Sequence, residues 1–211
     1  MRVTSAEFVK SAAKAAHYAP DTLPEVAFAG RSNSGKSTLI NTLTGYHRLA
    51  KASTSPGRTQ LIQFFLINKT FSFADLPGYG YAKVPAAVKA SWRPMIETYF
   101  RERGNLRLVV LVADIRRDIS DDERLLIDWL TLYDRPVMLV LSKIDKLSRN
   151  QQFLRLKQIR ASLNALPTEA IFPYSGHTGE GKEKIWFHIE HILESKTNIL
   201  QQVRDKSDFL H

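Results

Sequence analysis

GRSNSGKS, residues Gly30–Ser37, is the octapeptide that sets the architecture of this chain. It matches the pattern G-x-x-x-x-G-K-[ST], in which two glycines let the backbone curl so that its N–H groups converge on phosphate oxygens. The helix that follows directs its positive end at the same oxygens, and the lysine neutralises the β- and γ-phosphates. The sequence therefore predicts a nucleotide site in which Lys36 is catalytic and Ser37 offers its hydroxyl to Mg²⁺.

The residues on either side of this phosphate loop have the patterns of a strand and a helix. Val26–Gly30 is a short apolar run, and residues 36–44 read as a helix closed by Gly45. A strand, a loop and a helix in this order form the context that the motif requires. We expect the nucleotide to contact the loop and the start of the helix, which comprise Gly30, Arg31, Ser32, Asn33, Ser34, Gly35, Lys36, Ser37 and Thr38.

Further strands follow along the chain. Ile62–Ile67 and Thr70–Asp75 are β-rich runs separated by two residues, the spacing of a tight antiparallel hairpin. The apolar runs Leu108–Ala113 and Val137–Leu141 are typical of strands covered on both faces of a parallel sheet, and 170–174 is a candidate last strand. The prediction is an α/β fold of the P-loop NTPase type. It has a doubly wound, mostly parallel sheet of about six strands, with one antiparallel edge and flanking helices.

Helices are expected between and after these strands. Apolar residues recur at helical spacing in 89–103, although Pro94 suits only a helix that begins near Trp92 and should otherwise kink it. Two further helices are indicated by capping boxes, in which a serine is followed three residues later by Glu or Gln. These boxes are Ser120 with Glu123 and Ser148 with Gln151, and a last helix carries Ile185, Ile189 and Ile192.

The two ends of the chain flank a single nucleotide-binding domain, which we place at residues 24–195. Residues 1–23 form an N-terminal extension, in which Thr4 could cap a helix but Phe8 would suit a short strand, so both alternatives stay open. Residues 196–211 form a polar C-terminal tail without a clear periodic pattern, and we expect it to be partly disordered.

The composition narrows the setting in which the chain acts. No apolar run reaches the roughly 18 residues that span a bilayer, and no signal peptide is recognisable, so a cytoplasmic protein without a membrane partner is expected. The absence of cysteine removes disulfides and cysteine-ligated metals. A net charge of +9 favours contact with something anionic, most commonly nucleic acid.

Ser142-Lys143-Ile144-Asp145 follows the run 137–141 directly and so lies at a strand's carboxyl end. It resembles the N/T-K-x-D element that recognises guanine. A carboxylate at Asp145 can accept two hydrogen bonds from the guanine base, which adenine cannot offer, and such a site rejects the analogue by on the order of 10⁴-fold. Lys143 is expected to lie along the base and brace the phosphate loop. Ser142 replaces the usual Asn or Thr.

DLPG at residues 75–78 matches the D-x-x-G element that senses the third phosphate. Asp75 would hold Mg²⁺ through water, and the Gly78 amide would contact the γ-phosphate, which makes the segment a switch. We expect all four residues at the nucleotide, namely Asp75, Leu76, Pro77 and Gly78.

Residues 55–60, SPGRTQ, form a polar segment with several hydroxyls. One threonine here should complete the Mg²⁺ shell when GTP is bound, and we choose Thr59 over Thr54 because it lies nearer the next strand. Gly57 and Arg58 are expected beside it at the nucleotide. Thr59 and Gly78 join Lys36 as the residues expected to act in hydrolysis.

With these motifs the chain resembles, over nearly its whole length, the EngB family of bacterial ribosome-biogenesis GTPases in the TrmE-Era-EngA-EngB-septin-like superfamily. The resemblance is carried by VAFAGRSNSGKSTLIN (26–41), TSPGRTQLIQFF (54–65) and above all DLPGYGYAKV (75–84). It implies a GTP- and Mg²⁺-dependent GTPase that acts in assembly of the large ribosomal subunit and is needed for normal cell division and septation. It also maps the loop beside guanine to Tyr174, Ser175 and Gly176, where backbone amides near Ser175 would meet the base oxygen. Gly176 replaces the commoner Ala or Ser.

The position after D-x-x-G, where many GTPases carry a water-orienting glutamine, is Tyr79. A phenol there is poorly suited to that task, so slow intrinsic hydrolysis is predicted. The water would be positioned by a partner, by a changed switch conformation or by a monovalent cation. Asn33 stands where K⁺-activated relatives carry an asparagine, and K⁺ is therefore a candidate cofactor beside GTP or GDP and Mg²⁺.

Clusters of basic residues suggest where a partner docks. We expect a monomer that binds the rRNA and proteins of the large ribosomal subunit, with a steep dependence on salt. Two other functions stay open: a P-loop kinase or ATPase, which the S-K-x-D element opposes, and a division factor that binds proteins and no RNA. One cluster comprises Arg149, Arg155, Lys157 and Arg160, and the other Arg101, Arg103, Arg107, Arg116 and Arg117.

Overall fold

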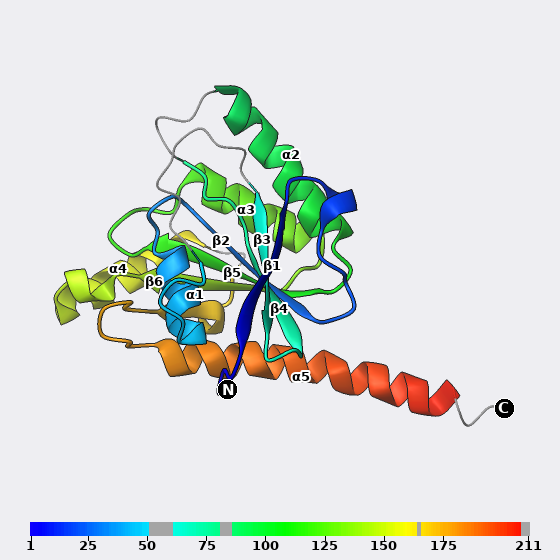
Figure 1. The fold of residues 1–211 in the computed structure, drawn as a ribbon. Helices are drawn as coiled ribbons and strands as arrows, with labels where there is room; N and C mark the ends of the chain where they lie inside the picture. The colour runs from blue at the N-terminus through cyan, green and yellow to red at the C-terminus, as the bar shows by residue number, and fades with distance from the viewer. Residues whose placement is uncertain (51–60, 81–85, 164–165, 208–211) are drawn as a thin grey trace.

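The computed structural model describes residues 1–50, 61–80, 86–163 and 166–207, and a seven-stranded sheet forms its centre (Figure 1). The strand order is β1-β3-β4-β2-β5-β6-β7. β4, β2, β5, β6 and β7 run parallel, whereas β3 is antiparallel to both β1 and β4. The strands are β1 (Ala6–Ala12), β2 (Glu25–Gly30), β3 (Ile62–Ile67), β4 (Phe71–Asp75), β5 (Leu106–Asp114), β6 (Val137–Ser142) and β7 (Ile171–Pro173).

Helices cover both faces of this sheet. α2 and α3 pack on one face together with α4, and α1 and α5 pack on the other (Figure 1). The α-helices are α1 (Lys36–Thr44), α2 (Ala86–Glu102), α3 (Asp121–Leu132), α4 (Arg149–Ser162) and α5 (Lys182–Ser207). The short 3₁₀ helices are η1 (Ala15–His17), η2 (Ile144–Lys146) and η3 (Thr168–Ala170). Among the described helices, none has the length and apolar content needed to cross a membrane.

The doubly wound, mostly parallel fold predicted from the sequence is confirmed, and so are its local signals. The β3-β4 turn places Asn68 and Lys69 at φ 50° and 58°, the left-handed pair that a two-residue hairpin turn requires. α1 ends at Gly45, whose φ of 78° is the left-handed conformation of a helix stop. Both capping boxes form, at Ser120 before α3 and at Ser148 before α4.

The structure decides one open alternative and corrects two local expectations. Of the two alternatives for the N-terminal extension, the strand is confirmed: it forms β1, which makes seven strands where about six were expected. α2 begins at Ala86, so Pro94 lies inside the helix and not in its first turn. α5 continues to Ser207, so the backbone of 196–207 is helical although the sequence there lacks a clear apolar period.

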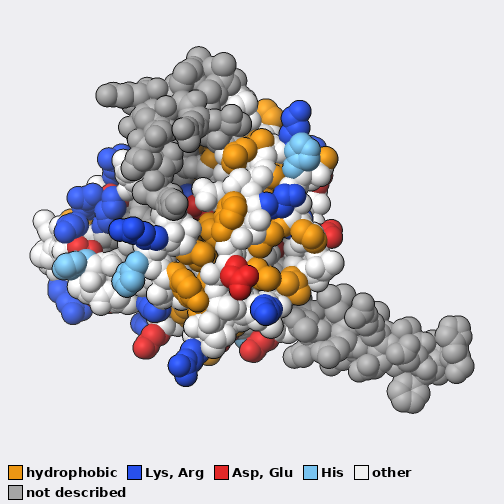
Figure 2. All heavy atoms as spheres, in the orientation of Figure 1, with side chains coloured by type: hydrophobic (Ala, Val, Ile, Leu, Met, Phe, Trp, Pro, Cys, Tyr) orange, Lys and Arg blue, Asp and Glu red, His pale blue; other side chains and the backbone are white. Residues whose placement is uncertain are grey.

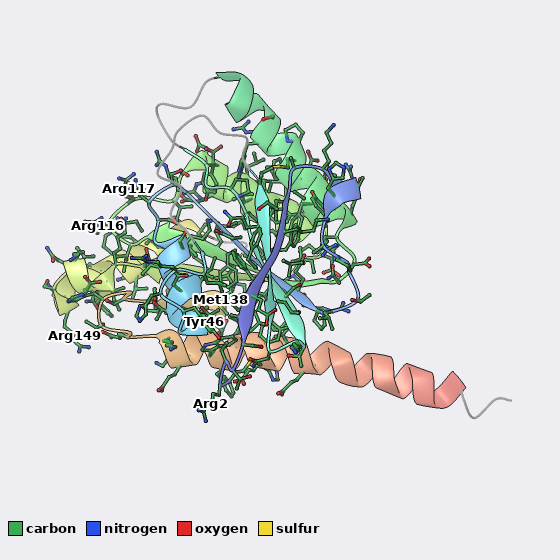
Figure 3. The ribbon with its side chains drawn as sticks, in the orientation of Figure 1. Arg2, Tyr46, Arg116, Arg117, Met138 and Arg149 are labelled. Carbon is green, nitrogen blue, oxygen red and sulfur yellow. The ribbon has the colours of Figure 1, made fainter. Side chains whose placement is uncertain are left out.

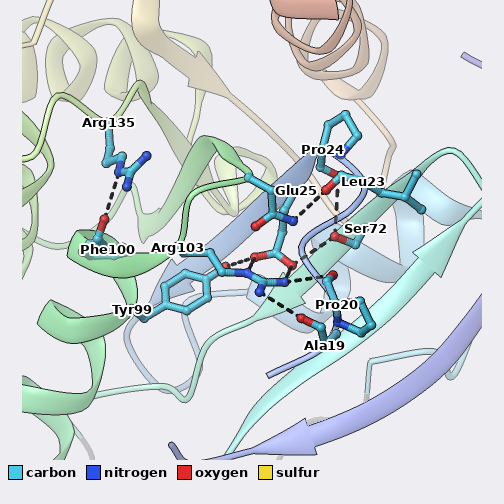
Figure 4. Close-up of polar contacts among 11 residues, drawn as sticks. Ala19, Pro20, Leu23, Pro24, Glu25, Ser72, Tyr99, Phe100, Arg103 and Arg135 are labelled. Atoms are coloured by element: carbon cyan, nitrogen blue, oxygen red, sulfur yellow. Dashed lines mark hydrogen bonds and ion pairs between the residues drawn. The ribbon is translucent and has the colours of Figure 1, made fainter. Parts of the chain in front are cut away.

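A buried ion pair holds the N-terminal segment against the sheet at the end away from the phosphate loop (Figure 4). Glu25, the first residue of β2, is fully buried, and both of its carboxylate oxygens accept 2.8 Å hydrogen bonds from Arg103. Tyr99 donates to the same carboxylate at 2.6 Å, and Ser72 donates at 3.0 Å. Arg103 also donates to the Ala19 carbonyl at 2.9 Å, which ties the segment before β2 into the network.

Arg103 is therefore not a docking residue. It was grouped with exposed arginines by sequence position alone, but only 6% of it is exposed, and its guanidinium is used inside the molecule.

Candidate nucleotide-binding site

The phosphate loop joins β2 to α1 at the carboxyl edge of the parallel strands, where a doubly wound sheet binds its ligands. Gly35 caps α1 at φ 99° and supplies no side chain, so the first-turn N–H groups of the helix face outward for an anion. Gly30 must also be glycine, because a Cβ there would lie 2.6 Å from the Val112 carbonyl oxygen. Both glycines of the motif are thus required by the local geometry, as its pattern predicts.

Lys36 and Asp75 meet at the start of α1 and the end of β4. The Lys36 ammonium forms an ion pair with the Asp75 carboxylate, and both side chains are at least nine-tenths buried. The fold therefore brings together two residues that are 39 positions apart. Lys36 was expected at the phosphates and Asp75 at the metal. Each neutralises the other here, and a bound metal–triphosphate would supply new partners for both.

The D-x-x-G segment lies directly against the phosphate loop. The Ser32 N–H donates to the Tyr79 carbonyl at 2.8 Å, and Arg31 and Tyr79 form an isolated parallel bridge. A Cβ on Gly78 would lie 3.1 Å from the Ser32 hydroxyl oxygen, so glycine permits this close approach. The side chain of Leu76 is in the core, and its backbone N–H donates to the Phe28 carbonyl at 2.9 Å.

The Tyr79 side chain is buried against α2. Only 5% of it is exposed, and its ring centroid lies 4.9 Å from that of Trp92 on α2. Trp92 in turn donates from its indole nitrogen to the Pro77 carbonyl at 3.0 Å. Burial, and after it the Glu123 carboxylate, raises the pKa of the Tyr79 phenol well above its ordinary value. A phenol buried against Trp92 is not positioned to orient an attacking water.

The S-K-x-D loop after β6 braces the phosphate loop in two places. The Ser142 hydroxyl donates to the Ser34 carbonyl and lies 3.1 Å from the Ala113 carbonyl oxygen. The Lys143 ammonium donates to the Asn33 carbonyl at 2.6 Å. A serine thus forms a tie to the phosphate loop at the position where Asn or Thr is usual.

The loop after β7 holds the Asp145 carboxylate in place. The Ser175 hydroxyl donates to one Asp145 oxygen at 2.7 Å, and it accepts the backbone N–H groups of His177 and Thr178 at 3.2 and 3.1 Å. The hydrogen bond from Ser175 is the main reason that the pKa of Asp145 lies below its usual value, and Lys146 adds to the shift. Asp145 is therefore a carboxylate at neutral pH, able to accept the guanine N–H groups.

The remaining residues of this loop have more specific places than the sequence suggested. The Tyr174 side chain is buried in the core beside α1 and α5, and its carbonyl accepts from the Ile144 N–H at 3.3 Å. The Ser175 N–H donates to the Glu180 carbonyl at 3.0 Å, which leaves Gly176 as the candidate amide for the base oxygen. A Cβ on Gly176 would lie 2.5 Å from the Thr38 methyl carbon, which explains glycine where Ala or Ser is commoner.

Asp114 is a residue of this site that the motifs did not reveal. It ends β5 beside Ser142 and lies 3.1 Å from the Lys143 ammonium, while Arg116 donates two side-chain hydrogen bonds to it, at 2.9 and 2.7 Å. Burial alone would raise the pKa of Asp114, but the bonds from Arg116 and Lys143 outweigh it and hold the pKa well below its usual range. An acidic residue that ends an apolar strand at the ligand-binding edge was the available signal.

A hollow opens between the phosphate loop and the end of β5. Its lining includes Asn33, Ser34, Asp114 and Arg117. Gly57, Arg58 and Thr59, which were assigned to the nucleotide and the metal, lie outside the described residues. All other predicted site residues fall at the carboxyl ends of β2, β4, β6 and β7 or at the start of α1.

The fold and the loops at this edge define the class: the chain is a P-loop GTPase. A family model described as 50S ribosome-binding GTPase matches residues 25–143. The probable GTP-binding protein EngB of Geobacter metallireducens is 48% identical over 92% of this chain and 94% of that protein, and that of Syntrophus aciditrophicus is 51% identical over 93% and 97%. The chain belongs to the EngB family of GTP-binding proteins and is a GTP-hydrolysing enzyme.

Solved structures agree with this assignment. The crystal structure of a probable GTP-binding protein engB superposes with a TM-score of 0.68 at 25% identity and covers 81% of this chain and 99% of its own. Aquifex aeolicus Era bound to GDP·AlF₄⁻ shares the fold with a TM-score of 0.59 at 22% identity, over 81% of this chain and 56% of that one.

Proposed function

We propose that this GTPase is a molecular switch in assembly of the large ribosomal subunit and, through that role, supports normal cell division and septation. The observation that carries the proposal is the match of residues 25–143 to a family described as 50S ribosome-binding GTPase. The net charge of +9 is of the sign that an RNA-rich partner requires. Such a protein would act as a monomer in the cytoplasm, where ribosomes are assembled.

Co-sedimentation with purified large subunits tests this role. The protein loaded with a non-hydrolysable GTP analogue should pellet with the subunits, and the GDP form should stay largely in the supernatant. Small subunits serve as the control. Equal recovery with both nucleotides, or with both subunits, would argue against a GTP-dependent large-subunit factor.

Mg²⁺ is part of the proposed cycle, and the donor set fits it. Ser37 offers a hydroxyl and Asp75 a carboxylate, both hard oxygen donors of the kind that Mg²⁺ prefers, with Thr59 as the further ligand expected from the sequence. Among the residues that the structure describes, no group of three His, Cys, Asp or Glu could hold a metal by itself. This suits an ion that shares its shell with phosphates and water. The ion would neutralise charge on the β- and γ-phosphates.

The intrinsic hydrolysis of GTP should be slow, because Tyr79 is buried against Trp92 and leaves the attacking water without a side chain at that position. K⁺ is the proposed alternative, with Asn33 as its candidate contact. The single-turnover rate of GTP hydrolysis should be higher in K⁺ than in Na⁺. Large subunits should raise the rate in both salts. Fast turnover in Na⁺ without subunits would contradict this part of the proposal.

A further inference from the structure

The outward face of α4 has an unusual composition for a solvent-exposed helix. The sequence of α4, RNQQFLRLKQIRAS, contains four basic residues and no acidic one. Arg149, Phe153, Lys157 and Arg160 recur at intervals of three and four residues, so they share one face, and all four are exposed. We call these four residues the α4 face. Figure 2 shows Lys and Arg side chains gathered on the side of the molecule where α4 lies, and Figure 3 labels Arg149 there.

The fourth basic residue of the helix, Arg155, has a different role. It was grouped with the other three by sequence position, but its side chain is 22% exposed and donates to the carbonyls of Ile115 and Arg117 at 3.1 and 2.7 Å. It thus fastens α4 to the loop after β5. By contrast, Arg149, Lys157 and Arg160 take part in no ion pair within the described part of the chain.

The exposed aromatic ring of Phe153 is a second feature of the α4 face. It is 67% exposed, so folding gains little from it, and it lies one helical turn from both Arg149 and Lys157. A phenyl ring surrounded by cations matches the chemistry of an unstacked nucleotide, whose base stacks on the ring while its phosphates contact the cations. An acidic protein surface could pair with the positive charges, but it offers no flat base to stack on the aromatic ring between them.

We propose that the α4 face binds RNA, with Phe153 stacking on an unpaired base and Arg149, Lys157 and Arg160 contacting its backbone phosphates. The inference rests on the proposed role at the large subunit and assigns a surface and a chemical class to that contact. The helix that carries this face begins four residues after Asp145, which lies in η2.

Binding of the full chain, loaded with a non-hydrolysable GTP analogue, to large subunits and to deproteinised large-subunit rRNA tests the proposal. Phe153→Ala should weaken binding to both by about tenfold and leave the salt dependence unchanged. Arg149→Ala/Lys157→Ala/Arg160→Ala should lower the slope of log K against log salt by about 2, since each phosphate contact contributes about 0.7 with single strands.

Matched controls lie elsewhere on the surface. Phe187 on α5 is 72% exposed, so Phe187→Ala removes an equally exposed ring. The triple variant Arg2→Ala/Lys69→Ala/Lys184→Ala removes three exposed positive charges away from α4. Phe187→Ala should bind with wild-type affinity. The control triple variant should bind slightly more weakly because of its lower net charge, and this loss should be smaller than that of the α4 triple variant. All variants should melt at the wild-type temperature, because the altered side chains are exposed.

A photocrosslinking residue at 153, with one at 187 as control, identifies the partner directly. Protease digests every crosslinked product, because each one contains this protein, so nuclease treatment identifies the partner. A crosslinked product that nuclease shortens contains RNA and supports the proposal. A product whose size nuclease leaves unchanged shows a ribosomal protein at the α4 face and overturns it. Wild-type affinity in the α4 variants would also overturn it while leaving the proposed function intact, whereas a wild-type protein that fails to bind subunits would remove both.

Discussion

At the residue scale, the motifs predicted which side chains converge but not what holds them. The contacts of Lys143 and Ser142 with the phosphate loop follow from sequence spacing, because Ser142 ends β6 and Lys143 comes directly after it at the ligand-binding edge. The support that Asp114 gives to Lys143, and the space that Gly176 leaves for Thr38, depend on neighbouring strands and loops. No pattern within one segment contains that information.

Asp145→Asn should change the base that the protein prefers. The amide can donate to the O2 of xanthine but cannot accept two N–H groups from guanine, so GDP affinity should fall by on the order of 10⁴-fold and XDP should become the better ligand. Calorimetry with GDP and XDP measures the exchange, and recovered XDP binding shows that the variant is folded. Unchanged GDP affinity would remove the role assigned to Asp145.

Asp114→Asn should weaken GDP binding on the order of tenfold, because Lys143 loses the charged partner that aligns it with the phosphate loop. Titration with a fluorescent GDP analogue gives the affinity. Asp128→Asn, which changes an exposed carboxylate on α3, is the control and should bind as the wild type does. Equal loss in both variants would show a general charge effect.

The same residue predicts a pH dependence of stability. The folded pKa of Asp114 is depressed, so its contribution is present above the unfolded pKa of about 3.9 and is lost as the pH falls toward the folded value. The difference in unfolding free energy between the wild type and Asp114→Asn should therefore be largest near neutral pH and shrink below about pH 4. Urea unfolding at several pH values measures it, and a constant difference would contradict the mechanism.

At the scale of elements, the sequence predicted those helix ends and turns that are determined by a few neighbouring residues. Capping boxes, a left-handed hairpin turn and a glycine stop each act within a few residues, and they formed where expected. β1 stayed ambiguous because its pairing with β3 is long-range: Ala6 lies opposite Ile67. The interior position of Pro94 was missed because α2 begins earlier than its apolar pattern indicates.

Arg103→Met should destabilise the protein by about 3–5 kcal/mol, because it leaves the Glu25 carboxylate buried without its cation. Thermal or urea unfolding measures the loss. Arg101→Met alters an exposed arginine in the last turn of α2, two residues earlier in the chain, and should leave the melting temperature unchanged. The pair Glu25→Leu/Arg103→Met should recover part of the stability, and failure to recover would indicate a packing effect.

At the scale of the whole molecule, the sheet separates two tasks. The nucleotide loops lie at the carboxyl ends of the parallel strands, while the Glu25–Arg103 network lies at their amino ends. The overall class followed from the order of strands and motifs. The placement of basic residues did not, since Arg103 and Arg155 are engaged inside the fold whereas Arg149, Lys157 and Arg160 are exposed. The positions of basic residues in the sequence do not show which side chains are used in internal contacts and which are exposed.

The Glu25–Arg103 pair also affects the order in which the nascent chain can fold. Glu25 and Arg103 are 78 positions apart, and β1 pairs with a strand that is synthesised at least 50 residues later. The first segment of the nascent chain must therefore wait, with its apolar side chains unprotected, until much of the domain has left the ribosomal tunnel. During that interval the chain exposes the most apolar surface, so chaperone binding and aggregation compete most strongly with folding.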